Sequence, residues 1–387
     1  MQKQIYLDNA STTPIDSQVL KAMQPYLTSK YGNASSQHAK GREAKEALEK
    51  SRKIIAKSIG AKSSEIYFTS GGTESNNWTT KGLFFKQKEL QTGKNHIITT
   101  KIEHDCVLNS CKWLEKTQAA KVTYLDVNSE GFIDLQQLKD SITDKTFLVS
   151  IIHGNNEIGT IQDLKEIGKI CREKKVLFHI DACQSYTKTE VNVKKQNLDL
   201  ITLNAHKIHG PKGVGVLYIR KGIQITPLQH GGGHESGLRS GTESISGIVG
   251  FAEAVKISNN KDIKKMKQLQ EKMINEILKI PNTKINGPIP GEKRLCNNIN
   301  ICFSNIEGES IGGYLERENI FTSTGSACSS HALEPSHVLT AIGRSHIETN
   351  SSIRVSISKF TTEEDISKFL NLLPKVVNKL RRLSPFA

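Results

Sequence analysis

The chain has 387 residues, of which 36% are hydrophobic and 24% are charged, and this balance excludes an intrinsically disordered, collagen-like or coiled-coil protein. No uninterrupted apolar run approaches the roughly 20 residues of a membrane helix, so we expect no membrane-spanning segment. The net charge of +14 is compatible with a nucleic-acid binder, an enzyme for anionic substrates or a lysine-rich proteome.

The amino-terminal sequence MQKQIYLDNASTT predicts a strand followed by a turn. It contains no apolar signal core, so we expect a cytoplasmic protein. Lysines between residues 256 and 272 are scattered on a predicted helix face, without the interleaved aromatic side chains of a nucleic-acid stacking surface. We therefore favour a solvated helix face and expect no direct nucleic-acid partner.

The seven cysteines form neither a CxxC pair nor a zinc-ligand spacing, so no metal site is predicted from them. Their odd number, in a chain without an export signal, indicates free thiols. Cys171 and Cys302 have apolar neighbours and are expected to be buried. Cys328 differs because it lies in TSTGSACSSHALEPSH, a run of small polar residues that predicts an exposed loop.

Short β-branched segments alternate with helical patterns between about residues 65 and 220. The predicted strands are EIYFTS, NHIITTKI, KVTYLDV, TFLVSII, VLFHID, LDLITLN and GVGVLYI. Helical patterns such as DLKEIGKICREKK lie between several of them. The alternation predicts an α/β fold with a mostly parallel, seven-stranded sheet that is covered by helices on both faces.

A Gly-rich stretch, HGGGHESGLRSGTES, precedes a long amphipathic segment that predicts one helix from Ser244 to Ile280. The rest of the chain mixes strand-like and helix-like segments, from NNINICFSN to TEEDISKFLNLLPKVVNKL. We predict a large domain over residues 16–258 and a smaller α+β domain over residues 259–387. Residues 1–15 are expected to contribute to the smaller domain.

The first informative strand exit is EIYFTS, which is followed by Gly71-Gly72-Thr73 at the start of a helix. Ligands of open parallel sheets bind beyond the carboxyl ends of the strands. Glycines let the backbone approach a ligand, Thr73 adds a hydroxyl, and the helix start supplies free N–H groups. The motif predicts a phosphate cradle, although it lacks the P-loop lysine and an ordinary helix start is the alternative.

Two further strand exits carry ionisable residues. VLFHIDACQS places Asp181 at a strand end, with Gln184 three residues later. A buried carboxylate needs a cation or several donors, which a protonated ring nitrogen would supply, and the alternative is an Asp that caps the next turn. LITLNAHKIHGPKG places Lys207 beside His206, after another strand. A lysine near other cations has a lowered pKa and can become an imine-forming nucleophile. The alternative is a plain surface lysine.

Proteins contact pyridoxal 5'-phosphate through three groups. A cradle binds its phosphate, an acid pairs with its protonated ring nitrogen, and a lysine binds its aldehyde. Thr73, Asp181 and Lys207 supply them in one α/β domain. His104 in KIEHDCVLNS could stack on the ring, and Asn156 in HGNNEIG could reach its phenolic oxygen. The sequence therefore predicts a pyridoxal-phosphate enzyme.

These residues lie in motifs that together resemble the cysteine desulfurases of the class-V aminotransferase family, the NifS/IscS-like enzymes of iron–sulfur cluster assembly. The matching motifs follow one another over nearly the whole chain: YLDNASTT, YGNASSQH, FTSGGTESNN, IEHDCV, NNEIG, HIDACQS, AHKIHGPKG, HGGGHESGLRSGT, TSTGSACSS, LEPSHVL and SSIRVSI. The resemblance implies fold type I of the pyridoxal-phosphate transferases, a homodimer, and conversion of L-cysteine to L-alanine.

The resemblance also implies a role for each matching position. Lys207 would hold the cofactor aldehyde, Asp181 would pair with the ring nitrogen, Gln184 and Asn156 would contact the phenolic oxygen, and His104 would stack. The remaining implied contacts are Thr73, Glu74, Asn204, His206 and the partner subunit's Thr242 for the cofactor, and Asn33 and Arg354 for the substrate.

Cys328 is the implied acceptor of the substrate sulfur. Its thiolate would need a nearby positive group or a proton acceptor such as His104, and its Gly/Ser-rich loop would let the sulfur move toward an acceptor. The implied acceptors are an iron–sulfur scaffold protein, or a carrier for tRNA thiolation, and Cys328 could transiently bind a cluster iron. An inert loop thiol is the alternative.

Three departures from the family pattern and two other function classes stay open. Asn204 stands where relatives usually have Ser, Ala34 replaces a proline, and the chain stops at LRRLSPFA without the longer tail with which relatives hold a scaffold. A selenocysteine lyase or an aminotransferase would need no mobile cysteine. A basic, non-catalytic scaffold would bind nucleic acid in a steeply salt-dependent way.

Overall fold

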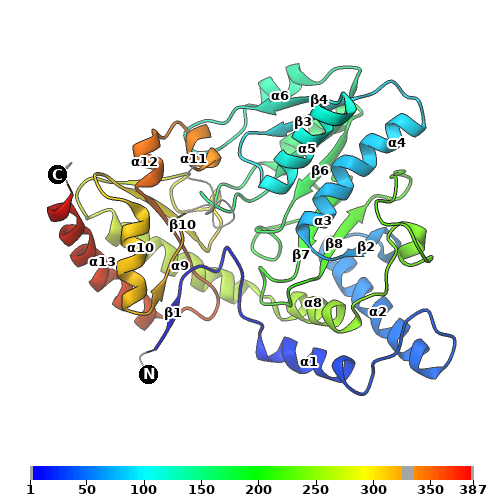
Figure 1. The fold of residues 1–387 in the computed structure, drawn as a ribbon, viewed down its shortest axis with the longest axis horizontal. Coiled ribbons are helices and arrows are strands. Elements are labelled where there is room, and N and C mark those ends of the chain that lie inside the picture. Colours follow the sequence, from blue (N-terminus) through cyan, green and yellow to red (C-terminus); the bar gives the residue numbers. More distant parts are fainter. Residues whose placement is uncertain (1–2, 325–334, 385–387) are drawn as a thin grey trace.

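The computed structural model describes residues 3–324 and 335–384. Its centre is the seven-stranded sheet, in the order β2-β8-β7-β6-β5-β3-β4 (Figure 1). The strands are β2 (Ile66–Thr69), β3 (His96–Thr100), β4 (Lys121–Leu125), β5 (Thr146–Ile152), β6 (Leu177–Asp181), β7 (Leu200–Asn204) and β8 (Gly215–Ile219). Only β8 pairs antiparallel with its neighbours, so the prediction of a mostly parallel seven-stranded sheet is confirmed.

Helices cover both faces of this sheet, because its strands are apolar on both sides. They are α1 (Ser17–Leu27), α2 (Ala39–Ser58), α3 (Gly72–Asn77), α4 (Leu83–Glu89), α5 (Asp105–Gln118), α6 (Leu135–Ser141), α7 (Leu164–Glu173) and α8 (Ile245–Ile257). Neighbouring strand residues point to opposite faces, so Ile98 belongs to the same hydrophobic cluster as α2, α7 and α8, while Ile97 belongs to the cluster that contains α4 and α5. A π-helical turn, Trp78–Gly82, joins α3 to α4 in one continuous helical segment.

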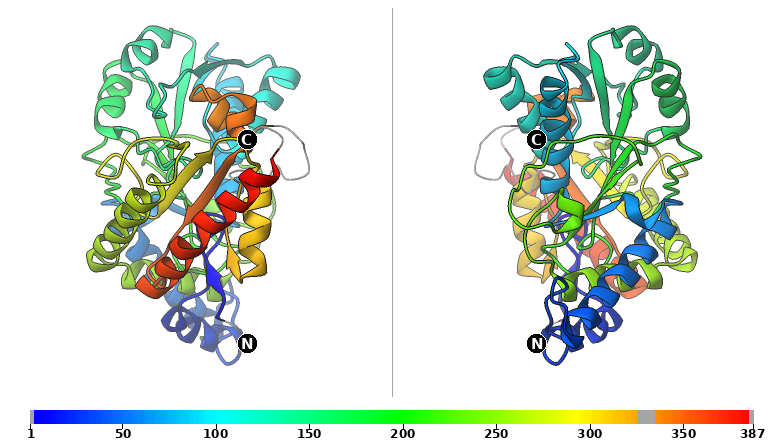
Figure 2. Two further views of the ribbon diagram at one scale, coloured as in Figure 1. Left: turned by 90° about the vertical axis from the view of Figure 1, so that its left-hand side faces the viewer. Right: turned by 90° about the vertical axis from the view of Figure 1, so that its right-hand side faces the viewer.

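A second hydrophobic core lies around a smaller antiparallel sheet in the order β12-β10-β9. The left view of Figure 2 shows the helices of this part, coloured from yellow-green to red. Its elements are α9 (Asn260–Ile277), β9 (Thr283–Ile285), β10 (Asn298–Phe303), α10 (Gly308–Arg317), β12 (Ser352–Ser356) and α13 (Glu363–Leu383). The short helices α11 (His337–Ala341) and α12 (His346–Asn350) connect this part to the large sheet. This mixture of strands and helices is the predicted α+β arrangement.

The prediction of one helix from Ser244 to Ile280 is wrong, because two helices, α8 and α9, occupy this segment. Ser258 leaves the helical conformation with φ −65° and ψ 134°. Asn259 then caps α9 by accepting a hydrogen bond from the Asp262 backbone N–H, a local interaction that competes with a continuous helix. The predicted domain division after residue 258 falls at this break.

The amino-terminal segment runs between the two parts of the fold. Strand β1 (Ile5–Tyr6) pairs with β11 (Ile320–Phe321), and Asn9 donates to the Ser356 carbonyl. Ile5 and Leu7 belong to the second hydrophobic core. Thr13 then contacts the His206 carbonyl at the large sheet. Residues 5–13 therefore connect the small sheet to the carboxyl edge of the large one.

No helix in residues 3–324 and 335–384 is long and apolar enough to cross a membrane. The same residues contain no group of three or more His, Cys, Asp or Glu side chains placed to hold a metal ion.

Candidate active site

Strands β6 and β7 are neighbours in the large sheet and end at Asp181 and Asn204. Asp181 is only 4% exposed. Its Oδ1 accepts the Cys183 backbone N–H at 2.9 Å, and its Oδ2 accepts the Asn76 side-chain amide at 2.7 Å. The carboxylate therefore caps the following turn, as the alternative interpretation predicted, and also faces α3. Asn76 is a site residue that the motif analysis missed, although it lies within the quoted FTSGGTESNN.

The predicted phosphate cradle lies where α3 approaches this edge of the sheet. A Cβ atom on Gly72 would lie 2.6 Å from the Cys183 Sγ, so only glycine allows this approach. Thr73 is exposed at the start of α3. Asn204 is 4% exposed, and its Oδ1 has no hydrogen-bond partner among the described residues. A buried amide oxygen without a partner is costly, and a donor from a bound ligand would satisfy it.

Glu74 borders the cradle but its carboxylate is already paired. Arg239 donates to both carboxylate oxygens, at 2.8 and 3.1 Å, and the Ser70 backbone N–H donates at 2.6 Å. Although burial opposes ionisation, the hydrogen bonds from Arg239 and Ser70 keep the pKa of Glu74 below its usual value. The pair links α3 to the Gly-rich segment that contains Thr242.

His104 precedes α5 on a neighbouring side of the site. Its Nδ1 accepts the Cys106 backbone N–H at 3.2 Å and lies 3.2 Å from the Cys106 Sγ, which also contacts the Asn76 amide at 3.2 Å. An accepting Nδ1 leaves the proton of a neutral ring on Nε2. Asn76 contacts both Cys106 and Asp181, so the structure brings His104 and Asp181 to one site. Cys106 was not among the predicted site residues.

Lys207 follows β7, and its ammonium donates to the Ala10 carbonyl. The Gln184 side-chain amide donates to the same carbonyl at 2.8 Å. The predicted residues Lys207 and Gln184 therefore meet at the amino-terminal segment. Ala10 escaped the prediction because its contribution is a main-chain oxygen, which no side-chain pattern reveals.

His206, beside Lys207, is a neutral imidazole at pH 7. Burial, and then the positive charges of Lys207, Lys212 and Lys188, lower the pKa of His206 to about 4. Its Nδ1 lies 3.1 Å from the Thr12 hydroxyl. A neutral ring can present one N–H donor to an anion without adding a charge to the site.

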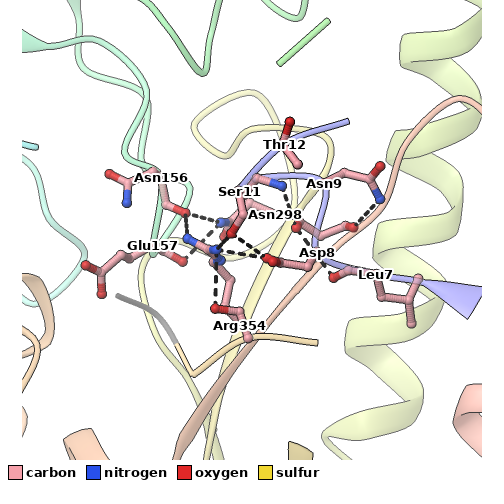
Figure 3. A network of polar contacts seen from close by, with 12 residues as sticks. Leu7, Asp8, Asn9, Ser11, Thr12, Asn156, Glu157, Asn298 and Arg354 are labelled. Carbon is pink, nitrogen blue, oxygen red and sulfur yellow. Dashed lines mark hydrogen bonds and ion pairs between the residues drawn. The ribbon is translucent and has the colours of Figure 1, made fainter. Parts of the chain in front are cut away.

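Arg354 lies in β12, is 2% exposed and joins several segments (Figure 3). Its Nη2 donates to Asp8 at 2.9 Å and to Ser11 at 2.7 Å, and its Nη1 donates to the Asn156 carbonyl at 3.2 Å. The Asn156 side chain points away from the guanidinium in this view. A substrate carboxylate at Arg354 would therefore share the guanidinium with Asp8.

The two asparagines of NNEIG differ in their contacts. Asn155 is fully buried, and its Oδ1 accepts the Glu157 and Ile158 backbone N–H groups while its amide donates to the Ile102 carbonyl. These hydrogen bonds use the Asn155 side chain to stabilise the loop. Among the described residues, the Asn156 side chain makes no such loop contact, so its amide is not committed to the loop in this way.

Two predicted site residues, Asn33 and Thr242, have no hydrogen bond to this cluster among the described residues. Asn33 is exposed, and its Oδ1 accepts the Ser35 backbone N–H in a local turn. Thr242 is also exposed, and no hydrogen bond among the described residues connects it with Thr73 or His206. Cys328 lies outside the described residues. The six described cysteines are free, and Cys171 and Cys302 are buried as predicted.

The described residues on both sides of residues 325–334 are anchored near the site. Ser323 and Arg354 exchange two backbone hydrogen bonds, at 3.0 and 2.6 Å. On the other side, the Ser336 hydroxyl donates to Glu157 at 2.6 Å, and the His337 Nε2 lies 2.9 Å from the Glu103 carbonyl oxygen. Ser323 therefore lies beside Arg354, and His337 lies beside Glu103, the residue before His104.

Lysine, carboxylate and a glycine-bounded helix start at the carboxyl edge of an α/β sheet define a pyridoxal-phosphate enzyme of fold type I. The aminotransferase class-V family model matches residues 5–369. The chain is 46% identical over 386 residues to a protein named cysteine desulfurase IscS from Methanosarcina thermophila, covering 99% of this chain and 94% of that one.

Two solved structures are also similar to this chain. One is named a NifS-like protein, with TM-score 0.90, 38% identity, and coverage of 98% of this chain and 100% of that one. The other is described as SspA in complex with cysteine, with TM-score 0.82, 38% identity, and coverage of 93% and 100%. The chain belongs to the class-V aminotransferase family, whose enzymes use pyridoxal 5'-phosphate.

The residues of this chain fit that cofactor. Gly72 lets the start of α3 approach the sheet edge more closely than any residue with a Cβ atom could, and Asp181 presents a buried carboxylate between β6 and α3. Lys207 supplies an amine at the adjoining strand end. Bound there, the cofactor would supply an electron sink for the substrate carbon next to the amino group.

Proposed function

We propose that this protein is a cysteine desulfurase, which converts L-cysteine and a protein thiol to L-alanine and a protein persulfide. The observation that carries the proposal is the meeting of Lys207, Gln184, Asp181 and Asn76 at one sheet edge, with Arg354 beside the same amino-terminal segment. Full-length relatives named cysteine desulfurase and a solved neighbour described with cysteine support L-cysteine as the substrate.

The proposed roles follow from what each side chain can donate or accept. Lys207 holds the cofactor aldehyde in the resting enzyme, and its freed amine later takes the α-proton of cysteine and returns a proton to the product carbon. Asp181 keeps a proton on the ring nitrogen. Thr73, His206 and the side-chain N–H groups of Asn204 would hold the phosphate, Gln184 and Asn156 would contact the phenolic oxygen, and His104 would stack on the ring.

Arg354 binds the substrate carboxylate in this proposal. Its guanidinium is preorganised by Ser11 and the Asn156 carbonyl, while Asp8 balances its charge. Sulfur transfer then breaks the Cβ–S bond of cysteine and forms an S–S bond to the Cys328 sulfur. The proton of the Cys328 thiol passes to a base, for which the Nδ1 of His104 is the proposed acceptor because its Nε2 already carries the ring proton, and protons complete the methyl group of alanine.

Cys328 is within reach of this chemistry by chain length. It lies five positions after Ser323 and eight positions before Ser336. An extended chain covers up to about 3.4 Å per residue, so five residues span up to about 17 Å from the Ser323 anchor beside Arg354. This supports Cys328 as the persulfide carrier, which would pass sulfur to an iron–sulfur scaffold protein, with a tRNA-thiolation carrier and transient cluster binding as further possibilities.

A homodimer and a cytoplasmic location complete the proposal. Thr73 and Thr242 are both exposed, which leaves the phosphate cradle open to a contribution from the partner subunit's Thr242. Asn33 is exposed as well, and we keep its proposed substrate contact as part of the assembled dimer. The free thiols at all six described cysteines support a reducing compartment.

The test measures alanine and protein-bound sulfur from labelled L-cysteine. We expect wild-type enzyme to produce both, and Lys207→Ala to lose the visible absorbance of lysine-bound cofactor and at least about a thousandfold in rate. Cys328→Ala should lose the persulfide. Unchanged sulfur release by Cys328→Ala would instead identify a lyase or aminotransferase that needs no mobile cysteine. Salt-dependent nucleic-acid binding without alanine would identify a non-catalytic scaffold.

A further inference from the structure

Lys188 lies in the turn after β6, seven residues beyond Asp181, and its ammonium contacts the backbone of two site residues. Its Nζ donates to the Gln184 carbonyl at 2.9 Å and to the Lys207 carbonyl at 3.2 Å. Both hydrogen bonds are charge-assisted, the stronger class of protein hydrogen bond. Lys188 therefore connects the segment after β6 with the segment after β7.

The two residues that Lys188 holds by the backbone also meet through their side chains. The Gln184 amide and the Lys207 ammonium both donate to the Ala10 carbonyl. Three chain segments are thus joined at Lys207. The Ala10 carbonyl accepts from its ammonium, and the Lys188 ammonium donates to its backbone carbonyl. A shift of the Lys207 backbone would have to break a bond to Lys188.

Lys188 has no acidic partner that would explain its charge. Within residues 3–324 and 335–384 no carboxylate forms an ion pair with it, and burial lowers the pKa of Lys188 to about 8. Its charge instead helps to lower the pKa of the two nearby imidazoles, His206 and His209. Burying an ammonium without a counter-ion destabilises the fold. The two hydrogen bonds of Lys188 to carbonyl groups offset part of this cost.

A small cavity of about 50 Å³ adjoins this arrangement, and Lys188, Lys207, His209 and Lys359 are among its lining residues. Lys359 provides a useful contrast in the same cavity. Its ammonium pairs with Asp16 and, within the described residues, makes no hydrogen bond to Lys207. The two lysines therefore share surroundings and differ in whether they touch the Lys207 backbone.

We propose that Lys188 is a positioning residue, which holds the Lys207 backbone so that the Lys207 amine faces the cofactor aldehyde. The proposal rests on the proposed role of Lys207. Lys188 touches neither substrate nor cofactor in this assignment. Its contribution is to the rate at which Lys207 captures the aldehyde and to every later step that uses the Lys207 amine.

The experiment follows cofactor capture directly. Full-length protein is freed of cofactor, incubated with pyridoxal 5'-phosphate and quenched with borohydride, which leaves a stable tag on the lysine that held the aldehyde. Peptide mass spectrometry then gives the rate of tagging at Lys207. We expect Lys188→Met to slow this rate by on the order of tenfold to a hundredfold, because small misplacements of a reacting group have effects of this size. Lys188→Arg keeps the charge and the donors. On a logarithmic scale of the tagging rate, we expect it to recover at least half of what Lys188→Met loses.

The matched control is Lys359→Met, which removes a cation from the same cavity but no contact to Lys207. We expect it to capture the cofactor at the wild-type rate, even if its melting temperature falls. In steady-state assays with cysteine, Lys188→Met should lower kcat while KM changes less than about threefold, since Arg354 is untouched. If Lys188→Met does not fold, Lys188→Gln against Lys188→Arg makes the same comparison.

Wild-type capture by the neutral Lys188 variant would overturn the proposal, and so would an equal loss in Lys359→Met. Failure of the proposed function has a different signature, because wild-type protein would then carry its tag on a lysine other than Lys207 or carry none.

Discussion

The candidate site has two sides that are built in different ways. The sheet side comprises Asp181, Asn204 and Lys207, each within three residues of the end of β6 or β7. The carboxylate side comprises Arg354 with Asp8, Ser11 and Asn156, from three segments separated by up to 346 residues in sequence. The sheet side is fixed by strand pairing, whereas the carboxylate side depends on hydrogen bonds between segments.

This difference predicts how each side responds to substitution. On the sheet side, changing a side chain leaves the backbone scaffold in place and removes chemistry. On the carboxylate side, changing a side chain also alters how the segments hold one another. The following predictions test this contrast, beginning with the largest expected effect.

Asp181→Asn should reduce the rate of alanine formation by about a hundredfold to a thousandfold, because it removes the buried charge that would hold a proton on the cofactor. Stability should change little, since an amide oxygen can still accept the Cys183 N–H and the new NH2 group can donate to the unpartnered Oδ1 of Asn76 once that amide flips. Asp199→Asn is the control. Asp199 is also buried, but it directly precedes β7 and its carboxylate pairs with Arg220. We expect it to lower the melting temperature and leave kcat within about threefold. Equal kcat losses in both variants would contradict the assignment.

Arg354→Lys should raise KM for cysteine at least about tenfold, the loss expected of one charge-assisted hydrogen bond. A lysine cannot reproduce the contacts of the planar guanidinium with Asp8, Ser11 and Asn156. Steady-state kinetics over a range of cysteine concentrations measure this. Arg344→Lys provides the comparison, because Arg344 bonds to Asn286 in the same part of the fold without contacting Asp8. A KM that stays at the wild-type value in Arg354→Lys would remove Arg354 from the substrate site.

Asp8→Asn should lower KM for cysteine by about twofold to fivefold, the range of a partly screened ion pair. Asp8 shares the Arg354 guanidinium with any bound carboxylate, so removing its charge favours the anionic substrate. Cysteine titration under the same conditions as for Arg354→Lys tests this. An increase in KM would indicate that Asp8 mainly orients Arg354.

Glu103→Gln should have its main effect on stability and little on activity. Burial raises the pKa of Glu103 to about 8, from an ordinary value of 4.5. The folded state therefore retains this proton while the unfolded chain releases it, so the residue makes wild-type protein less stable as the pH rises from about 4.5 to about 8. Glu103→Gln has no ionisable group at this position, so this decrease in stability with pH is absent from the variant.

Urea unfolding at pH 5.5 and pH 8 tests this prediction. The stability of Glu103→Gln relative to wild type should increase between the two pH values. Gln can still accept from Thr100 and from the Ile152 backbone N–H, so a large loss at both pH values would point to altered packing instead.

The sequence predicted the sheet side well, because local signals carry it. All seven β-branched segments form strands, and Asp181 and Lys207 follow their strands closely enough to be located by pattern alone. The break between α8 and α9 was missed, because an Asn cap at Asn259 interrupts an otherwise continuous amphipathic pattern. Local cap chemistry outweighed the hydrophobic period there.

The carboxylate side could be predicted only through the family resemblance. No periodicity connects Asp8 with Arg354, and the Ala10 carbonyl contributes an atom that every residue possesses. Asn76 and Cys106 were missed for a related reason, since their importance lies in contacts with Asp181 and His104 that only the folded chain creates. Lys188 likewise resembles any other lysine in the sequence until its two carbonyl contacts are known.

The path of residues 5–13 has a consequence for biosynthesis. These residues leave the ribosome first, yet the strands and carbonyl groups that hold them, at Phe321 and Ser356, are translated near the end. A nascent or prematurely terminated chain therefore has the amine at position 207 without the carbonyl of Ala10 locked beside it. Productive loading with vitamin B6 should be a late event, completed only after almost the whole polypeptide has been made.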